Sequence, residues 1–150
     1  IAINHILESA IDLLSHRFED ISVILSLGDL VTITGYPIDL MHAFIAIIEN
    51  SIEALGHQGK IEISTVLLNE EILVRIIDHG NEGIPKDIKN NIFEPFFTSK
   101  EKGTGLGLYQ AHKTIVDNHD GTIDFESWPG TTKCSVSIPV RTSISDVEEP

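Results

Sequence analysis

The chain contains a glycine-rich run that leads directly into a segment with helical spacing, 106–118. The run reads Gly103-Thr104-Gly105-Leu106-Gly107-Leu108. Glycine lets a backbone approach a ligand closely. The start of a helix offers unpaired N–H groups and the positive end of the helix dipole, which suit a phosphate group. With Gly107 and Leu108 in the first helical turn, the run could bind a phosphorylated ligand, or it could simply be a flexible loop before a packed helix.

Two other polar residues stand beside apolar patterns. Asp78 ends a predicted strand, 72–77, and shares a face with its apolar residues, so its carboxylate could accept a hydrogen bond from the amino group of a base. It could also be an ordinary turn-forming Asp before Gly80. Asn50 shares a helical stripe with Ala46, next to a strongly apolar stripe, where an unpaired amide is costly to bury. The alternative for Asn50 is to cap a nearby backbone group.

A fourth segment, 93–100, has three aromatic residues in five positions and ends in Lys100. The aromatic side chains could simply pack a loop. Lys100 precedes the glycine-rich run by a few residues, so its ammonium group could reach a phosphate as a point charge.

These residues need elements to position them. Helical spacing predicts helices over 1–17, 37–56 and 106–118, and short alternating runs predict about six strands. The strands are 21–25, 31–33, 60–67, 72–77, 122–126 and 132–139. The stretch 78–105 has one short helical pattern, 85–92, and its length is typical of a functional lid. Because hairpins dominate, the pattern favours a two-layer α/β sandwich, with about three helices on one face of a mixed, mostly antiparallel sheet.

Composition narrows the classes of function. The 150 residues carry a formal net charge of −13, which argues against binding to nucleic acid or to anionic membrane. No apolar run reaches the length of a membrane span. Cys134 is the single cysteine and is expected to be a small core residue in a reducing, cytoplasmic setting. One domain is expected over 1–140, followed by an acidic, disordered tail over 141–150. The absence of an initiator Met suggests a fragment.

The order of these segments resembles the ATP-binding catalytic domain of histidine kinases, within the group that includes DNA gyrase, Hsp90 and the MutL repair proteins. The segment Phe93-Glu94-Pro95-Phe96-Phe97-Thr98-Ser99-Lys100 is similar to the histidine kinase version specifically. The resemblance extends from about Ile3 to Pro139. It implies a Bergerat-type sandwich with a mobile ATP lid. It also implies a two-component protein-histidine kinase activity, in which Mg-ATP donates its γ-phosphate to a histidine.

The resemblance also implies roles for individual residues. Asn50 matches the residue that holds Mg²⁺ against the phosphates, and Asp78 matches the aspartate that reads the adenine amino group. Lys100 is expected to act on the phosphates with Asn50. The remaining implied ATP-binding residues lie around the base, in the lid and at the phosphate-facing helix start: Gly80, Gly83, Ile84, Phe97, Thr98, Gly103, Thr104, Gly105, Leu106, Gly107 and Leu108.

Two positions depart from the family pattern. Ala46 stands where many members carry Glu or Asn, so strong ATP hydrolysis is not expected, whereas transfer to a histidine is less affected because imidazole is itself a nucleophile. Asn81 and Glu82 separate Gly80 from Gly83, one residue more than usual. These departures motivate the alternative of a nucleotide-binding or protein-interaction module without phosphotransfer. An ATP-gated clamp like MutL or Hsp90 is a third reading, which Ala46 and the aromatic segment disfavour.

None of the seven His residues has the sequence context of a phosphoacceptor, and all are expected to be surface or core residues. The acceptor is therefore expected on a dimerisation and histidine phosphotransfer domain elsewhere in the full-length chain. The other implied partner is the receiver domain of a response regulator. The isolated domain is expected to be a monomer without direct membrane contact.

Overall fold

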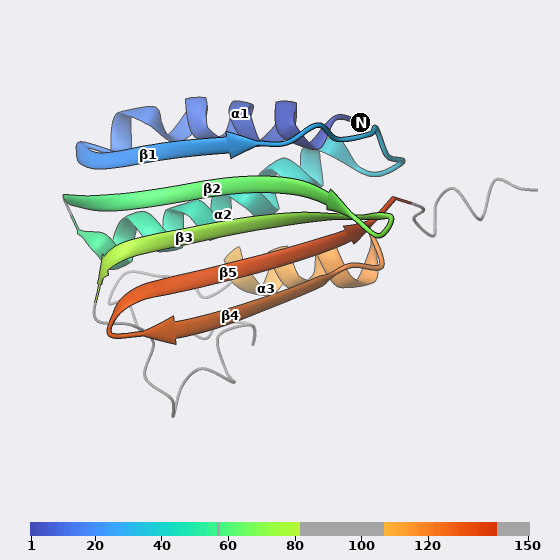
Figure 1. The fold of residues 1–150 in the computed structure, drawn as a ribbon. Helices are drawn as coiled ribbons and strands as arrows, with labels where there is room; N and C mark the ends of the chain where they lie inside the picture. The colour runs from blue at the N-terminus through green and yellow to red at the C-terminus, as the bar shows by residue number, and fades with distance from the viewer. Residues whose placement is uncertain (57, 82–106, 141–150) are drawn as a thin grey trace, which may run out of the picture.

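The computed structural model describes residues 1–56, 58–81 and 107–140, which form three α-helices and a five-stranded sheet (Figure 1). The helical elements are α1 (Ile3–Leu14), the 3₁₀ turn η1 (Ser15–Arg17), α2 (Pro37–Leu55), α3 (Gly107–His112) and the π-helical segment η3 (Lys113–Asp117). The strands are β1 (Asp20–Leu27), β2 (Gln58–Leu68), β3 (Glu71–Asn81), β4 (Thr122–Trp128) and β5 (Gly130–Pro139).

The sheet is mixed and mostly antiparallel, as predicted. Its order is β1-β2-β3-β5-β4, and only the β1–β2 pair among the described strands is parallel. Figure 1 shows the three helices on one face of this sheet, with α2 behind β2 and β3 and α3 behind β4 and β5. The predicted two-layer sandwich is confirmed.

The central helix α2 begins and ends where its sequence signals predict. Pro37 opens it, Asp39 lies in its first turn, and Gly56 follows its last residue. Proline suits a first helical turn, where its missing N–H group costs nothing. The residues that α2 buries are mostly apolar and lie on the stripe toward the sheet: Leu40, Ala43, Phe44, Ile47, Ile48, Ser51, Ile52 and Leu55. Burial of this stripe fixes which side of α2 faces β3.

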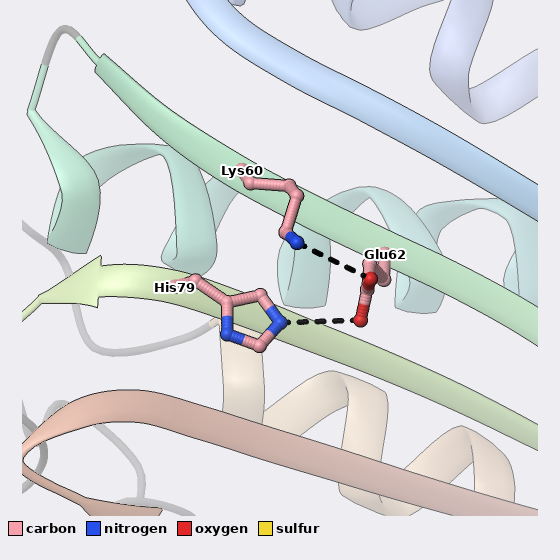
Figure 2. Close-up of polar contacts among 3 residues, drawn as sticks. All are labelled: Lys60, Glu62 and His79. Atoms are coloured by element: carbon pink, nitrogen blue, oxygen red, sulfur yellow. Dashed lines mark hydrogen bonds and ion pairs between the residues drawn. The ribbon is translucent and has the colours of Figure 1, made fainter.

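The strands alternate between the helical layer and the open face of the sheet. On β3, Ile72, Val74, Ile76 and Asp78 are all buried under the helices. His79, the next residue, lies on the open face, where its Nε2 is 3.1 Å from a carboxylate oxygen of Glu62 (Figure 2). Lys60 approaches the other Glu62 oxygen at 3.5 Å. The hydrogen bond from His79 lowers the pKa of Glu62, with Lys60 adding to the effect.

Several predicted boundaries change in the structure. The predicted strand 31–33 is wrong: Ile33 is buried, but its N–H group donates to the carbonyl oxygen of Ile1, and the segment pairs with no strand of the sheet. The described residues therefore hold five strands rather than six. β3 continues three residues past Asp78. The predicted third helix begins at Gly107 and widens to π geometry over its last five residues.

Cys134 is buried on β5 beside Val136 and Ile138, which confirms its prediction as a core residue. Desolvation, with the nearby carboxylates of Asp124 and Asp78, raises the pKa of its thiol far above the ordinary range. None of the helices in the described ranges combines the length and apolar character needed to cross a membrane. The predicted tail, 141–150, and the predicted short helix, 85–92, lie outside the described residues.

Candidate nucleotide-binding site

Asp78 is the polar centre of the helix-facing side of the sheet. It is 2% exposed, at the end of a row of three apolar β3 residues, with Ile61 of β2 and Thr132 of β5 as its register partners. Among the described residues, its Oδ1 atom has no hydrogen-bond partner. Burial raises the pKa of Asp78 to about 6, against smaller lowering effects from Ser51 and His79.

A buried carboxylate oxygen without a donor is costly, since its desolvation is uncompensated. Above pH 6 the group is mostly ionised and can only accept hydrogen bonds. The missing partner is therefore an N–H or O–H donor, and the exocyclic amino group of adenine is a donor of this kind. The buried oxygen of Asp78 fits the adenine that the sequence implies.

Helix α2 carries two adjacent polar residues, Asn50 and Ser51. Ser51 is 4% exposed and is among the groups that lower the pKa of Asp78, while Asn50, its neighbour in sequence, is half-buried. No group of three or more His, Cys, Asp or Glu residues that could hold a metal ion occurs in the described ranges. Mg²⁺ in nucleotide sites takes few protein ligands and completes its shell with phosphate oxygens and water. The single amide oxygen of Asn50 is consistent with that kind of shared coordination.

The start of α3 lies against α2 one helical turn before Asn50. A Cβ atom built on Gly107 would be 3.4 Å from the Cβ atom of Ala46. The two helices enclose a groove of about 480 Å³ beside this contact. Its lining comes from α2 and from the α3–η3 segment and the residue that follows it: Asp39, His42, Ala43, Ile45, Ala46, Glu49, Gly107, Gln110, Ala111, Lys113, Thr114 and Asn118.

The groove does not include the buried carboxylate of β3. Ala46 and Glu49 line the groove, whereas Asp78 and Ser51 do not. Glu49, which is adjacent to Asn50, forms an ion pair with Arg17 of η1.

Gly80 lies at the end of β3, where the pairing with β5 is irregular between His79 and Asn81. Its φ angle is +118°, a backbone conformation that residues with a Cβ atom rarely adopt. The register shift in the β3–β5 pair therefore needs glycine at this position.

The structure places five of the predicted site residues: Asn50 on α2, Asp78 and Gly80 on β3, and Gly107 and Leu108 at the start of α3. The other nine lie outside the described residues: Gly83, Ile84, Phe97, Thr98, Lys100, Gly103, Thr104, Gly105 and Leu106. Sequence analysis did not single out Ser51. The available signal was a small hydroxyl residue on the buried stripe of an otherwise apolar helix.

The comparisons with known proteins agree with this geometry. A family model described as histidine kinase-, DNA gyrase B-, and HSP90-like ATPase matches residues 35–142. The chain is 38% identical over 114 residues to sporulation kinase A of Bacillus subtilis (strain 168), covering 75% of this chain and 18% of that protein. It is 36% identical over 110 residues to the sensory histidine kinase/phosphatase NtrB of Vibrio alginolyticus, covering 65% and 31%. The chain thus spans less than a third of either relative.

Among solved structures, the nucleotide-free catalytic domain of histidine kinase ThkA superposes with a TM-score of 0.85 at 28% identity, covering 94% of both chains. ThkA has also been solved in complex with the response regulator protein TrrA. The chain belongs to the family of histidine kinase-, DNA gyrase B- and HSP90-like ATPases, and its similarity to named proteins lies with the sensor histidine kinases of that family.

Proposed function

We propose that this chain is the catalytic ATP-binding domain of a two-component sensor histidine kinase. It binds Mg-ATP and presents the γ-phosphate to a histidine on the dimerisation domain of its own full-length chain. The observation that carries the proposal is the buried Asp78 carboxylate, whose Oδ1 atom lacks a donor among the described residues. Adenine supplies that donor.

The phosphate end of the ligand is assigned to Asn50, the α3 start and Lys100. Asn50 holds Mg²⁺, which neutralises phosphate charge when it is bound. The backbone N–H groups of Gly107 and Leu108 are assigned to the phosphates, since Gly107 lies against Ala46, one helical turn before Asn50 on α2. Phosphoryl transfer depends mainly on positioning and charge neutralisation. The absence of a carboxylate at Ala46 therefore suits transfer to an imidazole better than activation of water.

The partners follow from this role. The acceptor histidine is assigned to the dimerisation domain, because none of the seven His residues of this chain has the sequence context of a phosphoacceptor. The complex of ThkA with a response regulator supports a receiver domain as the second partner.

Calorimetric titration with ATP, with and without Mg²⁺, tests the nucleotide site. The chain is compared with Asp78→Asn, whose amide offers an N–H donor toward the ligand, and with Asp124→Asn. Asp124 is exposed on the open face of β4, so the control makes the same substitution away from the site. We expect binding to the original chain and to Asp124→Asn, and none to Asp78→Asn. Equal binding by all three proteins would remove Asp78 from the site.

A second candidate is a module that binds nucleotide without phosphotransfer. Ala46 and the extra residue between Gly80 and Gly83 favour it. Incubation with Mg-ATP labelled at the γ-phosphate, together with the dimerisation domain of the full-length chain, separates the two functions. Labelled histidine is expected of the kinase, whereas nucleotide binding without label would favour the module.

A further inference from the structure

We propose that Arg17 is a positioning residue for the phosphate end of the nucleotide site. Its guanidinium group neutralises the Glu49 carboxylate, so that α2 can lie beside the phosphates of a nucleotide without repelling them. The inference rests on the proposed function, because it concerns the same site.

The helix that carries Asn50 has no positive charge of its own. Its 19 residues include three carboxylates, Asp39, Glu49 and Glu53, and neither Lys nor Arg. A nucleotide polyphosphate is also an anion, and the repulsion between like charges grows as their separation falls. A carboxylate of α2 that lies near the phosphates therefore needs a cation from another element.

Glu49 is the carboxylate of α2 closest to the proposed phosphate end. Positions three and four residues apart are neighbours on a helix, so Glu49 and Asn50 both flank Ala46 one turn later. Ala46 is the residue that Gly107 lies against at the start of α3. Ala46, Glu49 and Gly107 also line the same groove. The Glu49 side chain therefore borders the helix start that is assigned to the phosphates.

Arg17 brings the cation from a distant part of the sequence. It lies in η1, between α1 and β1, and precedes Glu49 by 32 residues. Its Nη1 atom donates a hydrogen bond to Oε2 of Glu49 and forms an ion pair with it. The two side chains are 34% and 39% exposed, and ion pairs this accessible contribute little to stability. Loss of the pair should therefore leave the domain folded and change the charge beside the ligand.

An uncompensated Glu49 should act differently on ADP and ATP. Both nucleotides place the same base against Asp78, but ATP carries one more phosphate and more negative charge. Repulsion by the free carboxylate should therefore weaken ATP binding more than ADP binding. Because Glu49 is partly exposed, added salt should screen the effect. A general loosening of the fold would instead weaken both nucleotides alike.

The test is calorimetric titration with ADP and with ATP, both without Mg²⁺ so that the metal does not contribute. Arg17→Met removes the positive charge, and the double variant Arg17→Met/Glu49→Gln removes both charges of the pair. Lys60→Met is the matched control. Lys60 also lies beside a carboxylate, that of Glu62, but on the open face of the sheet (Figure 2). Each single variant removes one positive charge from the chain.

We expect Arg17→Met to bind ATP about tenfold more weakly and ADP about threefold more weakly, with both losses smaller in high salt. The double variant should regain the original affinities, and Arg17→Lys should retain most of them. Lys60→Met should bind both nucleotides as the original chain does. If Arg17→Met does not fold, Arg17→Gln gives the same comparison, since its amide can still donate to Glu49.

Unchanged ATP affinity in Arg17→Met, beside normal binding by the original chain, overturns the role of Arg17 and leaves the nucleotide site intact. A loss that the double variant does not restore also overturns it, because that result indicates a structural effect. So does an equal loss in Lys60→Met, which would assign the effect to net charge. Failure of the original chain to bind either nucleotide, with or without Mg²⁺, overturns the proposed function together with this inference.

Discussion

Gly107 at the start of α3 lies directly against Ala46 of α2, and a methyl group built on Gly107 would meet the Ala46 Cβ atom at 3.4 Å. That distance is an ordinary van der Waals contact, so the two helices have just enough room for one more carbon atom. Gly121 offers a contrast: a Cβ atom there would lie 2.3 Å from the carbonyl oxygen of Ser137.

This contrast predicts opposite effects for the same substitution. Gly107→Ala should raise the free energy of unfolding by about 0.5–1 kcal/mol, because alanine favours the helix and meets no clash. Gly121→Ala should lower it by about 3 kcal/mol, because the backbone must move away from Ser137. Urea unfolding of both variants measures the two changes. Destabilisation by Gly107→Ala would show that α3 and α2 pack more tightly than the 3.4 Å contact indicates.

The raised pKa of Asp78 predicts how the free energy of unfolding depends on pH. Its pKa is raised from 3.8 to about 6 in the folded protein, chiefly by burial. The folded state therefore binds the proton more tightly than the unfolded state, and stability falls as pH rises from about 4 to above 6. The loss is on the order of 3 kcal/mol and is complete above the folded pKa.

Asp78→Asn cannot ionise and so isolates this effect. The free energy of unfolding of the original chain, minus that of Asp78→Asn, should decrease by about 3 kcal/mol between pH 3.5 and pH 7. Chemical denaturation of the two proteins across this range, without nucleotide, makes the comparison. Parallel stability curves would mean that Asp78 titrates alike in the folded and unfolded states. A stable Asp78→Asn that fails to bind ATP would show that the site keeps this carboxylate at the expense of stability.

Asn50 is predicted to contribute to binding only when Mg²⁺ is present. Asn50→Ala removes the amide oxygen, and we expect the gain in ATP affinity on adding Mg²⁺ to fall by about tenfold, typical of loss of one group around a bound metal. Affinity without Mg²⁺ should change little. Titrations with and without the ion give both values, and Glu53→Ala, at an exposed position one turn later, serves as the control. A Mg²⁺ effect that survives in Asn50→Ala would assign the metal to other groups.

His119 is predicted to be a structural residue. It is fully buried, its Nε2 accepts a hydrogen bond from the Tyr36 N–H group at 3.0 Å, and its Nδ1–H donates to the Thr114 carbonyl oxygen at 2.8 Å. The ring thereby ties the residue before α2 to η3. His119→Leu leaves both backbone groups unpaired, so we expect the free energy of unfolding to fall by about 3 kcal/mol.

The same change at His5, an exposed residue of α1, is the control and should stay within about 0.5 kcal/mol of the original chain. Thermal and urea unfolding measure both variants. A loss in His119→Leu no greater than in His5→Leu would contradict the buried hydrogen bonds.

Features set by neighbours along the chain were predictable. Pro37 and Gly56 bound α2 as expected, and Asn69-Glu70 forms the β2–β3 turn with φ angles of +52° and +63°. Both residues of such a tight hairpin turn need positive φ, which Asn tolerates more readily than most residues. The alternation along β3 also placed Asp78 on the apolar face, because side chains of a strand point to opposite faces in turn.

The wrong predictions of strands and helices came where the local sequence pattern disagrees with the hydrogen bonding of the folded chain. Residues 31–33 have strand-like composition, yet a strand exists only if another strand supplies hydrogen bonds, and here Ile1 alone pairs with Ile33. The predicted third helix carries helical spacing throughout, but spacing does not distinguish α from π geometry in η3.

The sequence by itself determined the elements, their order and the family, because periodicity, turn residues and short motifs are local properties of the chain. Only the tertiary structure decided that Asp78 of β3 is buried with no donor for its Oδ1 atom among the described residues, and that His79, one residue later, turns to Glu62 on the open face. It also decided that His119 is buried against Tyr36. The physical reason is that a hydrogen bond depends on a few tenths of an ångström between residues far apart in sequence, and those distances are set only when the helices pack on the sheet.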